Sequence, residues 1–206
     1  MTSRRIPALP ALAALAVAVA VAVALAAGAS TPARATEVVD ARADRPGAFP
    51  VLQAESLQGR RVRLPDQLKG ERNLLLVAYE RKQQADLDTW LAVLDTLPLQ
   101  PPAFAYYELP TIGNNYKFMR PVIDGGMKQG IPDRAQRDRT ITLYLDVDWF
   151  RAQVGTDTTD AVAALLVDRQ GTILARWYGP YTETAGAGLA AALTAAVPGN
   201  ADGADR

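Results

Sequence analysis

The sequence predicts an α/β domain in which strands and helices alternate along the chain. Residues 74–79 form a continuous apolar run, which is typical of a strand buried on both faces of a sheet. Apolar residues at helical spacing follow within 84–97. Near the end of the chain, two apolar segments flank the polar loop 168–171, which ends in glycine and predicts a β-hairpin. Alternating strands and helices that end in a hairpin favour a mixed sheet with an antiparallel edge.

Each further element rests on its own local pattern. The expected strands are 62–64, 74–79, 103–109, 140–145, 163–167 and 172–177. The expected helices are 84–97, 115–127, 149–154 and 184–197. In the first helix the core-facing residues are Leu87, Trp90, Leu91 and Leu94, and in the last they are Leu189 and Leu193. In the second helix Phe118, Val122 and Ile123 form the expected apolar face, although Pro121 interrupts it.

The two ends of the chain differ in composition from the region between them. Arg4 and Arg5 precede the uncharged apolar stretch 8–29, and Ala33-Arg34-Ala35 offers a cleavage site before Thr36. Residues 1–35 are therefore expected to be a signal peptide or, alternatively, an uncleaved membrane anchor. Residues 36–48 are predicted to be a linker or lead-in, 49–197 a single domain, and 198–206 a disordered tail.

The residue inventory excludes several kinds of chemistry. The chain of 206 residues contains no cysteine and no histidine. Thiol–disulfide exchange, imidazole acid–base catalysis and metal binding by thiolate or imidazole are therefore excluded. Beyond the leader the chain carries 19 basic and 22 acidic residues, because the leader contains three arginines and no acid. This mild acidity gives no support for nucleic-acid binding.

Three sequence blocks resemble the thioredoxin-like superfamily, in its peroxiredoxin and TlpA-type branch. They are LQGRRVRLPDQLKGERNLLLVAY, LLVDRQGTILARWYGP and AGAGLAAALTAAV, which resemble the entry to the first central strand, the closing hairpin and the last helix. A weaker similarity, carried by VAYERKQQADLDTW, is to the thioredoxin-like assembly factor of the mitochondrial ATP synthase. The resemblance implies a three-layer sandwich with a central mixed sheet, closed by a C-terminal hairpin and helix. It also makes residues 113–139 an insert between the second and third central strands.

The chain lacks both catalytic features of that superfamily. The place of the Cys-x-x-Cys motif, after the first central strand, reads Glu80-Arg81-Lys82-Gln83-Gln84-Ala85. The place of the cis-proline before the hairpin falls near Val162. The redox activity of the family therefore has no counterpart here, and the resemblance implies a redox-inactive member.

Two segments are candidate binding sites. The turn formed by Glu80, Arg81 and Lys82 follows a central strand and leads into a helix, where α/β folds often bind anions. The insert is rich in bases, of which Arg120, Arg137 and Arg139 are candidates for contacts with a partner or an anion. In both places the alternative is a solvated charged surface without a ligand.

Carboxylates mark two further positions. Alternation along the strand places Tyr106 and Glu108 on one face and Tyr107 on the other, and Glu108 is a candidate to accept a proton or to pair with Arg81 or Arg120. A structural tyrosine pair with an edge ion pair is the alternative. Asp146 and Asp148 are either a Mg²⁺-binding or acid–base pair, or caps of the following helix.

The sequence predicts an exported, redox-inactive binding or assembly-accessory protein with no cofactor, no catalytic residue and no metal site. Its localisation is expected to be periplasmic or extracellular, or anchored at a membrane if the leader is retained. The expected partner is another exported or membrane protein, or a small anion. The alternative function is a non-redox enzyme that acts on a small anionic substrate through carboxylate and arginine residues.

Overall fold

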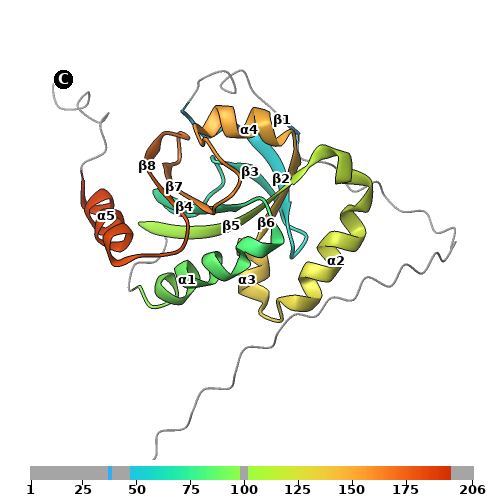
Figure 1. The fold of residues 1–206 in the computed structure, drawn as a ribbon, viewed down its shortest axis with the longest axis horizontal. Helices are drawn as coiled ribbons and strands as arrows, with labels where there is room; N and C mark the ends of the chain where they lie inside the picture. Colours follow the sequence, from blue (N-terminus) through green and yellow to red (C-terminus); the bar gives the residue numbers. More distant parts are fainter. Residues whose placement is uncertain (1–36, 39–46, 98–101, 196–206) are drawn as a thin grey trace, which may run out of the picture. The chain divides into compact units, whose positions relative to one another are not determined.

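A central sheet of eight strands organises the described part of the chain, residues 37–38, 47–97 and 102–195 of the computed structural model (Figure 1). The strands are β1 (Glu37–Val38), β2 (Leu52–Ser56), β3 (Arg61–Leu64), β4 (Arg72–Ala78), β5 (Phe104–Gly113), β6 (Ile141–Leu145), β7 (Ala163–Asp168) and β8 (Ile173–Tyr178). The order is β1-β2-β6-β5-β4-β7-β8, and β3 pairs with β2 beside this path. β4, β5 and β6 are parallel, whereas β7 and β8 form an antiparallel edge, so the predicted mixed sheet is confirmed.

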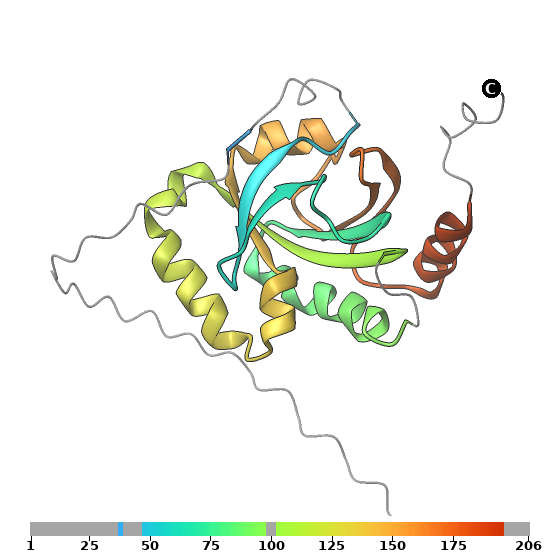
Figure 2. The same ribbon diagram turned by 180° about the vertical axis from the view of Figure 1, so that it is seen from behind.

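Helices cover both faces of the sheet and make three layers (Figures 1 and 2). The helical segments are η2 (Arg81–Gln83), α1 (Gln84–Leu94), η3 (Asn114–Met119), α2 (Arg120–Gly130), α3 (Arg134–Arg139), α4 (Val147–Val154) and α5 (Glu183–Thr194). Buried side chains of α1 and α5 pack on one face, and those of α4 pack on the other. All four residues predicted for the inner side of α1 are buried, as is Leu189 of α5.

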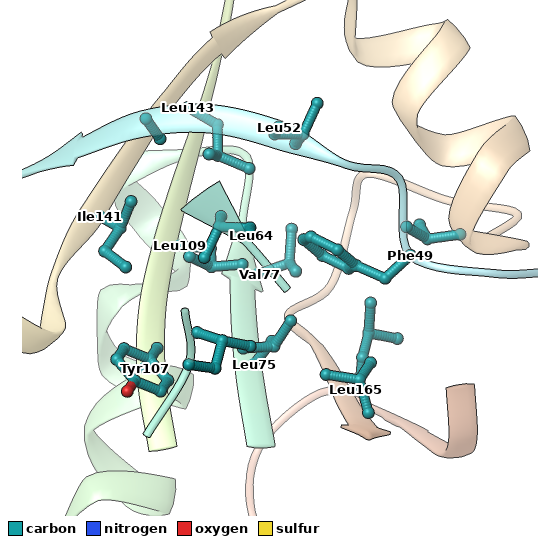
Figure 3. Close-up of a cluster of buried hydrophobic side chains, with 14 of the residues drawn as sticks. Phe49, Leu52, Leu64, Leu75, Val77, Tyr107, Leu109, Ile141, Leu143 and Leu165 are labelled. Atoms are coloured by element: carbon teal, nitrogen blue, oxygen red, sulfur yellow. The ribbon is translucent and has the colours of Figure 1, made fainter. Parts of the chain in front are cut away.

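The central strand β4 supplies side chains to both cores, as its uninterrupted apolar run predicts. Leu75 and Val77 enter one core (Figure 3), while Leu74 and Leu76 enter the other. The neighbouring strand β5 divides in the same way: Tyr107 belongs to the first core, and Tyr106 belongs to the second. The predicted placement of the two tyrosines on opposite faces is confirmed.

Four elements differ from the sequence-based expectation. The expected lead-in contains β1, which pairs with β2, and β2 itself was not predicted. β5 continues to Gly113, four residues past its expected end. The insert contains the unpredicted helix α3, because its sequence RAQRDR offers no apolar face by which to recognise a helix.

Candidate functional site

A buried glutamine closes the turn where the family would carry its reactive thiols. Gln83 is 2% exposed, and its Oε1 accepts hydrogen bonds from the backbone N–H groups of Tyr79 (2.8 Å) and Glu80 (3.3 Å). Its Nε2 donates to the carbonyl of Thr159, 2.5 Å away, in the segment that precedes β7. The Gln83 side chain therefore links η2 to the segment that precedes β7. Both its Oε1 and its Nε2 have hydrogen-bond partners within the protein.

The position of the family's cis-proline is occupied by apolar core. Val162 is fully buried and packs in the same core as α1 and α5. Its carbonyl accepts a hydrogen bond from the N–H of Gly179. A buried amide and a buried valine thus occupy the two positions that the sequence resemblance assigns to the motif and the cis-proline.

We expect Gln83→Ala to lower the free energy of unfolding by about 1.5 kcal/mol, because two backbone donors and one carbonyl lose their partner. Urea titration followed by circular dichroism measures the change. Gln84→Ala is the matched control, because Gln84 is exposed and its amide bonds Asp88 on the surface. Equal effects of the two substitutions would contradict a structural role for Gln83.

The other residues of the turn lie on the surface. Glu80 and Lys82 form an exposed ion pair of 2.9 Å, and the hydrogen bond to Glu80 raises the pKa of the Lys82 ammonium. Arg81 lies between them as the first residue of η2. Because the Lys82 charge is already paired, this turn is a weaker anion site than its composition suggests.

Glu108 is a buried carboxyl group under helix α3. It is 3% exposed, and its Oε1 accepts hydrogen bonds from Gln136 Nε2 (3.2 Å) and Thr140 Oγ1 (3.4 Å). Burial raises its pKa to about 6; the two hydrogen bonds and the charge of Arg139 act in the opposite direction. The nearby cation is therefore Arg139, rather than the expected Arg81 or Arg120.

Arg139 covers the tyrosine next to this carboxyl group. Its guanidinium carbon lies 4.5 Å from the centre of the Tyr106 ring, and its Nη2 lies 3.5 Å from Asp95 Oδ1. The Tyr106 hydroxyl donates to the same carboxylate oxygen, and burial together with this bond raises the tyrosine pKa. Asp95 is exposed, so this pair is a surface contact at the end of α1.

Arg120 is buried instead of lying on a contact surface. The residue is 5% exposed and pairs with Asp124 (3.1 Å) and Glu55 of β2 (3.4 Å). Its guanidinium carbon lies 5.6 Å from the ring centre of Tyr144 of β6, and the Tyr144 hydroxyl donates to Asp124 over 2.9 Å. The arginine therefore fastens α2 to the sheet, which corrects the expectation of an exposed binding residue.

Arg137 also has a structural role. Its Nε donates to Gln58 Oε1 (3.1 Å), and its Nη1 donates to the carbonyls of Ile131 (2.8 Å) and Pro132 (3.2 Å). The first contact holds α3 to the loop between β2 and β3, and the other two hold it to the connection from α2. The seven candidate residues thus lie in separate places, and among them the structure brings together Glu108 with Arg139 and Glu80 with Lys82.

η3 and α2 carry exposed apolar side chains. Phe118 is 81% exposed and Val122 69%, so these two residues of the expected apolar face lie on the surface. Tyr116 and Met119 are exposed beside them. We call these four side chains the η3–α2 face. The helix turns this way because its inward position is taken by Arg120, whose partners lie on β2 and β6.

Asp146 caps a helix. Its Oδ1 accepts the N–H of Trp149 at 3.0 Å, at the start of α4. Asp148 is exposed and pairs with Arg151 (3.3 Å). The capping interpretation is confirmed for Asp146, whereas Asp148 lies within the first turn of α4. Within the described ranges, no group of three or more acidic side chains is placed to hold a metal ion.

Comparisons with solved structures identify the fold. A protein from Aquifex aeolicus VF5 proposed to act in electron transfer superposes with a TM-score of 0.52 and 14% identity, over 73% of this chain and 96% of its own. A protein of the same organism proposed to act in electron transport gives a TM-score of 0.51, with the same identity and coverage. The chain has a thioredoxin-like fold. It is a cysteine-free form of that fold, so it has no thiol for disulfide exchange.

Other thioredoxin-like structures align over most of their length. A thiol:disulfide interchange protein of the thioredoxin family from Chlorobium tepidum TLS is 17% identical, over 75% of this chain and 99% of its own, with a TM-score of 0.46. No protein-family model and no curated protein sequence matches the chain. In the part of the thioredoxin-like chain that the structure describes, none of the helices has the length and apolarity needed to cross a membrane. The stretch 8–29 lies outside that part.

Proposed function

We propose that this thioredoxin-like chain is an exported binding or assembly-accessory protein whose contact surface is the η3–α2 face. The observation that carries the proposal is the concentration of exposed apolar side chains there. Of the five large hydrophobic residues exposed in the described ranges, four lie within residues 116–122. A contiguous exposed apolar patch on a folded domain marks a place where another molecule binds.

The rest of the fold supports binding over chemistry. The place of the redox site is filled by Gln83 and Val162, whose atoms are used in packing and hydrogen bonds. Export rests on the leader, residues 1–35, where two arginines precede an uncharged apolar stretch. The proposed location is therefore periplasmic or extracellular, with the domain held at a membrane if the leader is retained.

The alternative, a non-redox enzyme for a small anionic substrate, receives less support. Its carboxylate would be Glu108, whose raised pKa suits proton transfer. Two of its arginines, however, already have side-chain partners. Arg120 is buried and pairs with two carboxylates, and Arg139 contacts Asp95 and the Tyr106 ring at the surface.

Photo-crosslinking in the native host tests the proposal. A photoreactive amino acid in place of Val122 is expected to give a discrete crosslinked adduct. The same amino acid in place of Tyr178 is the control and is expected to give no such adduct. Tyr178 is also apolar and 46% exposed, but lies on β8, outside the η3–α2 face. Adducts that are absent at both positions, or identical at both, would overturn the proposed contact surface. Mass spectrometry of the N-terminus in the extracytoplasmic fraction tests export.

A further inference from the structure

Lys117 lies beside the η3–α2 face, and neither η3 nor α2 has an exposed acid. Every residue from Asn114 to Met119 is exposed, and the run contains Lys117 between Tyr116 and Phe118. Asp124, the acid of the following helix, is turned inward by Arg120 and by the Tyr144 hydroxyl. Within these two segments the acid is therefore held inside, while Lys117 is exposed next to the apolar side chains.

We propose that the η3–α2 face docks onto a membrane surface that contains anionic phospholipids. This inference rests on the proposed function and names the partner of the same face. Phenylalanine and tyrosine interleaved with lysine are the side chains that segments lying in the membrane interface use. The aromatic rings enter the headgroup region, and Lys117 meets lipid phosphates. A second copy of the chain is a poorer occupant, because it would bring the same lysines against one another.

The chain outside the described residues supports a lipid partner. The uncharged stretch 8–29 directs the protein to a membrane, whether it is cleaved during export or stays in the bilayer. If it stays, only residues 30–36 separate it from β1, and seven residues reach at most about 25 Å.

Fluorescence of a single label on the full-length chain tests the inference. The chain has no cysteine, so Phe118→Cys, Val122→Cys and Tyr178→Cys each carry one environment-sensitive nitrobenzoxadiazole label. The probe is vesicles of phosphatidylcholine with 30% phosphatidylglycerol. We expect labels at 118 and 122 to shift to the blue and to be quenched by lipids carrying nitroxide groups, while the label at 178 stays in water. Because the label reports its own surroundings, insertion of the leader alone does not produce this difference.

Charge provides the second arm of the experiment. Lys117→Glu, combined with Phe118→Cys, is expected to lower the ratio of docked to undocked protein about tenfold. The reason is that each lysine near an anionic membrane surface adds to the free energy of binding. Vesicles of phosphatidylcholine alone should have a similar effect. Labels at 118 and 178 that respond equally, or a response at 118 that is the same on both kinds of vesicle, would overturn the inference. A protein adduct at Val122 in cells, without shielding by vesicles, would leave the proposed function standing and assign the face to a protein partner.

Discussion

Arg120→Met is expected to lower the free energy of unfolding by about 3 kcal/mol, because it leaves a buried carboxylate without its cation. Asp124 has a side chain that is 16% exposed, and Arg120 is its closest cation at 3.1 Å. Glu55 loses the same partner, and the Tyr144 ring loses the guanidinium that covers it. Denaturant unfolding followed by circular dichroism measures the loss.

A second substitution separates charge burial from a simple loss of packing. The double variant Arg120→Met/Asp124→Asn has no unpaired carboxylate at position 124. The amide oxygen of the asparagine can still accept the hydrogen bond from the Tyr144 hydroxyl. We expect the double variant to regain at least half of the lost stability. Arg139→Met is the matched control, because its partner Asp95 has a side chain that is 60% exposed, and it should cost about 1 kcal/mol or less. A double variant no more stable than Arg120→Met would contradict the role assigned to the ion pair.

Glu108→Gln is expected to stabilise the protein by about 2 kcal/mol near pH 7.5. Burial raises the pKa of this carboxyl group from 4.5 to about 6, so the folded protein holds its proton more tightly than the unfolded chain does. A shift of this size corresponds to about 2 kcal/mol. The folded state therefore loses stability as the pH rises from 4.5 through 6, and the penalty is complete above that range. Glutamine carries no charge, so the Glu108→Gln variant does not lose this stability.

The charged groups around Glu108 act in opposite directions, so burial decides the sign of the effect. Arg139 of α3 favours the carboxylate and Asp88 of α1 disfavours it, but burial is the largest influence. Asp138 responds in a different range, because its bonds to Arg60 and Lys69 lower its pKa, so its contribution is lost only at more acidic pH.

Unfolding free energies measured between pH 4 and pH 8 test this prediction. The wild type should become less stable between about pH 4.5 and pH 6, whereas Glu108→Gln should stay level there. Glu71→Gln is the matched control, because it removes one carboxylate from an exposed position. A Glu108→Gln profile parallel to that of the wild type would show that Glu108 is not the group responsible.

Local patterns were sufficient for the elements whose apolar spacing is regular. Helix α1 buries all four residues predicted for its inner side, and β4 places alternate leucines in the two cores. Both elements are recognisable because their hydrophobic period matches their geometry. In contrast, β2 reads LQAES and offers only weak alternation. Its place depends on β3, which follows it directly and pairs with it as a hairpin, and on β6, which pairs with it from a distant part of the chain.

The candidate site shows the same division. The sequence identified Glu108 and Arg139 separately, but their proximity arises because β5 and α3 pack together. Gln83 was missed, since a glutamine in a charged turn carries no signal of burial. The sequence predicted an apolar face made by Phe118, Val122 and Ile123, but not that Phe118 and Val122 remain exposed.

The absence of cysteine and histidine excludes thiol and imidazole chemistry whatever the fold, because the reacting atoms are not in the chain. The order of apolar segments was likewise enough to predict a mixed α/β sheet, since burial on two faces imposes its own pattern. Which charged side chains are buried, and which apolar ones remain outside, depended on tertiary contacts. Arg120 lies inside because Glu55 and Tyr144 from two other strands meet it there, and Phe118 is exposed as a consequence.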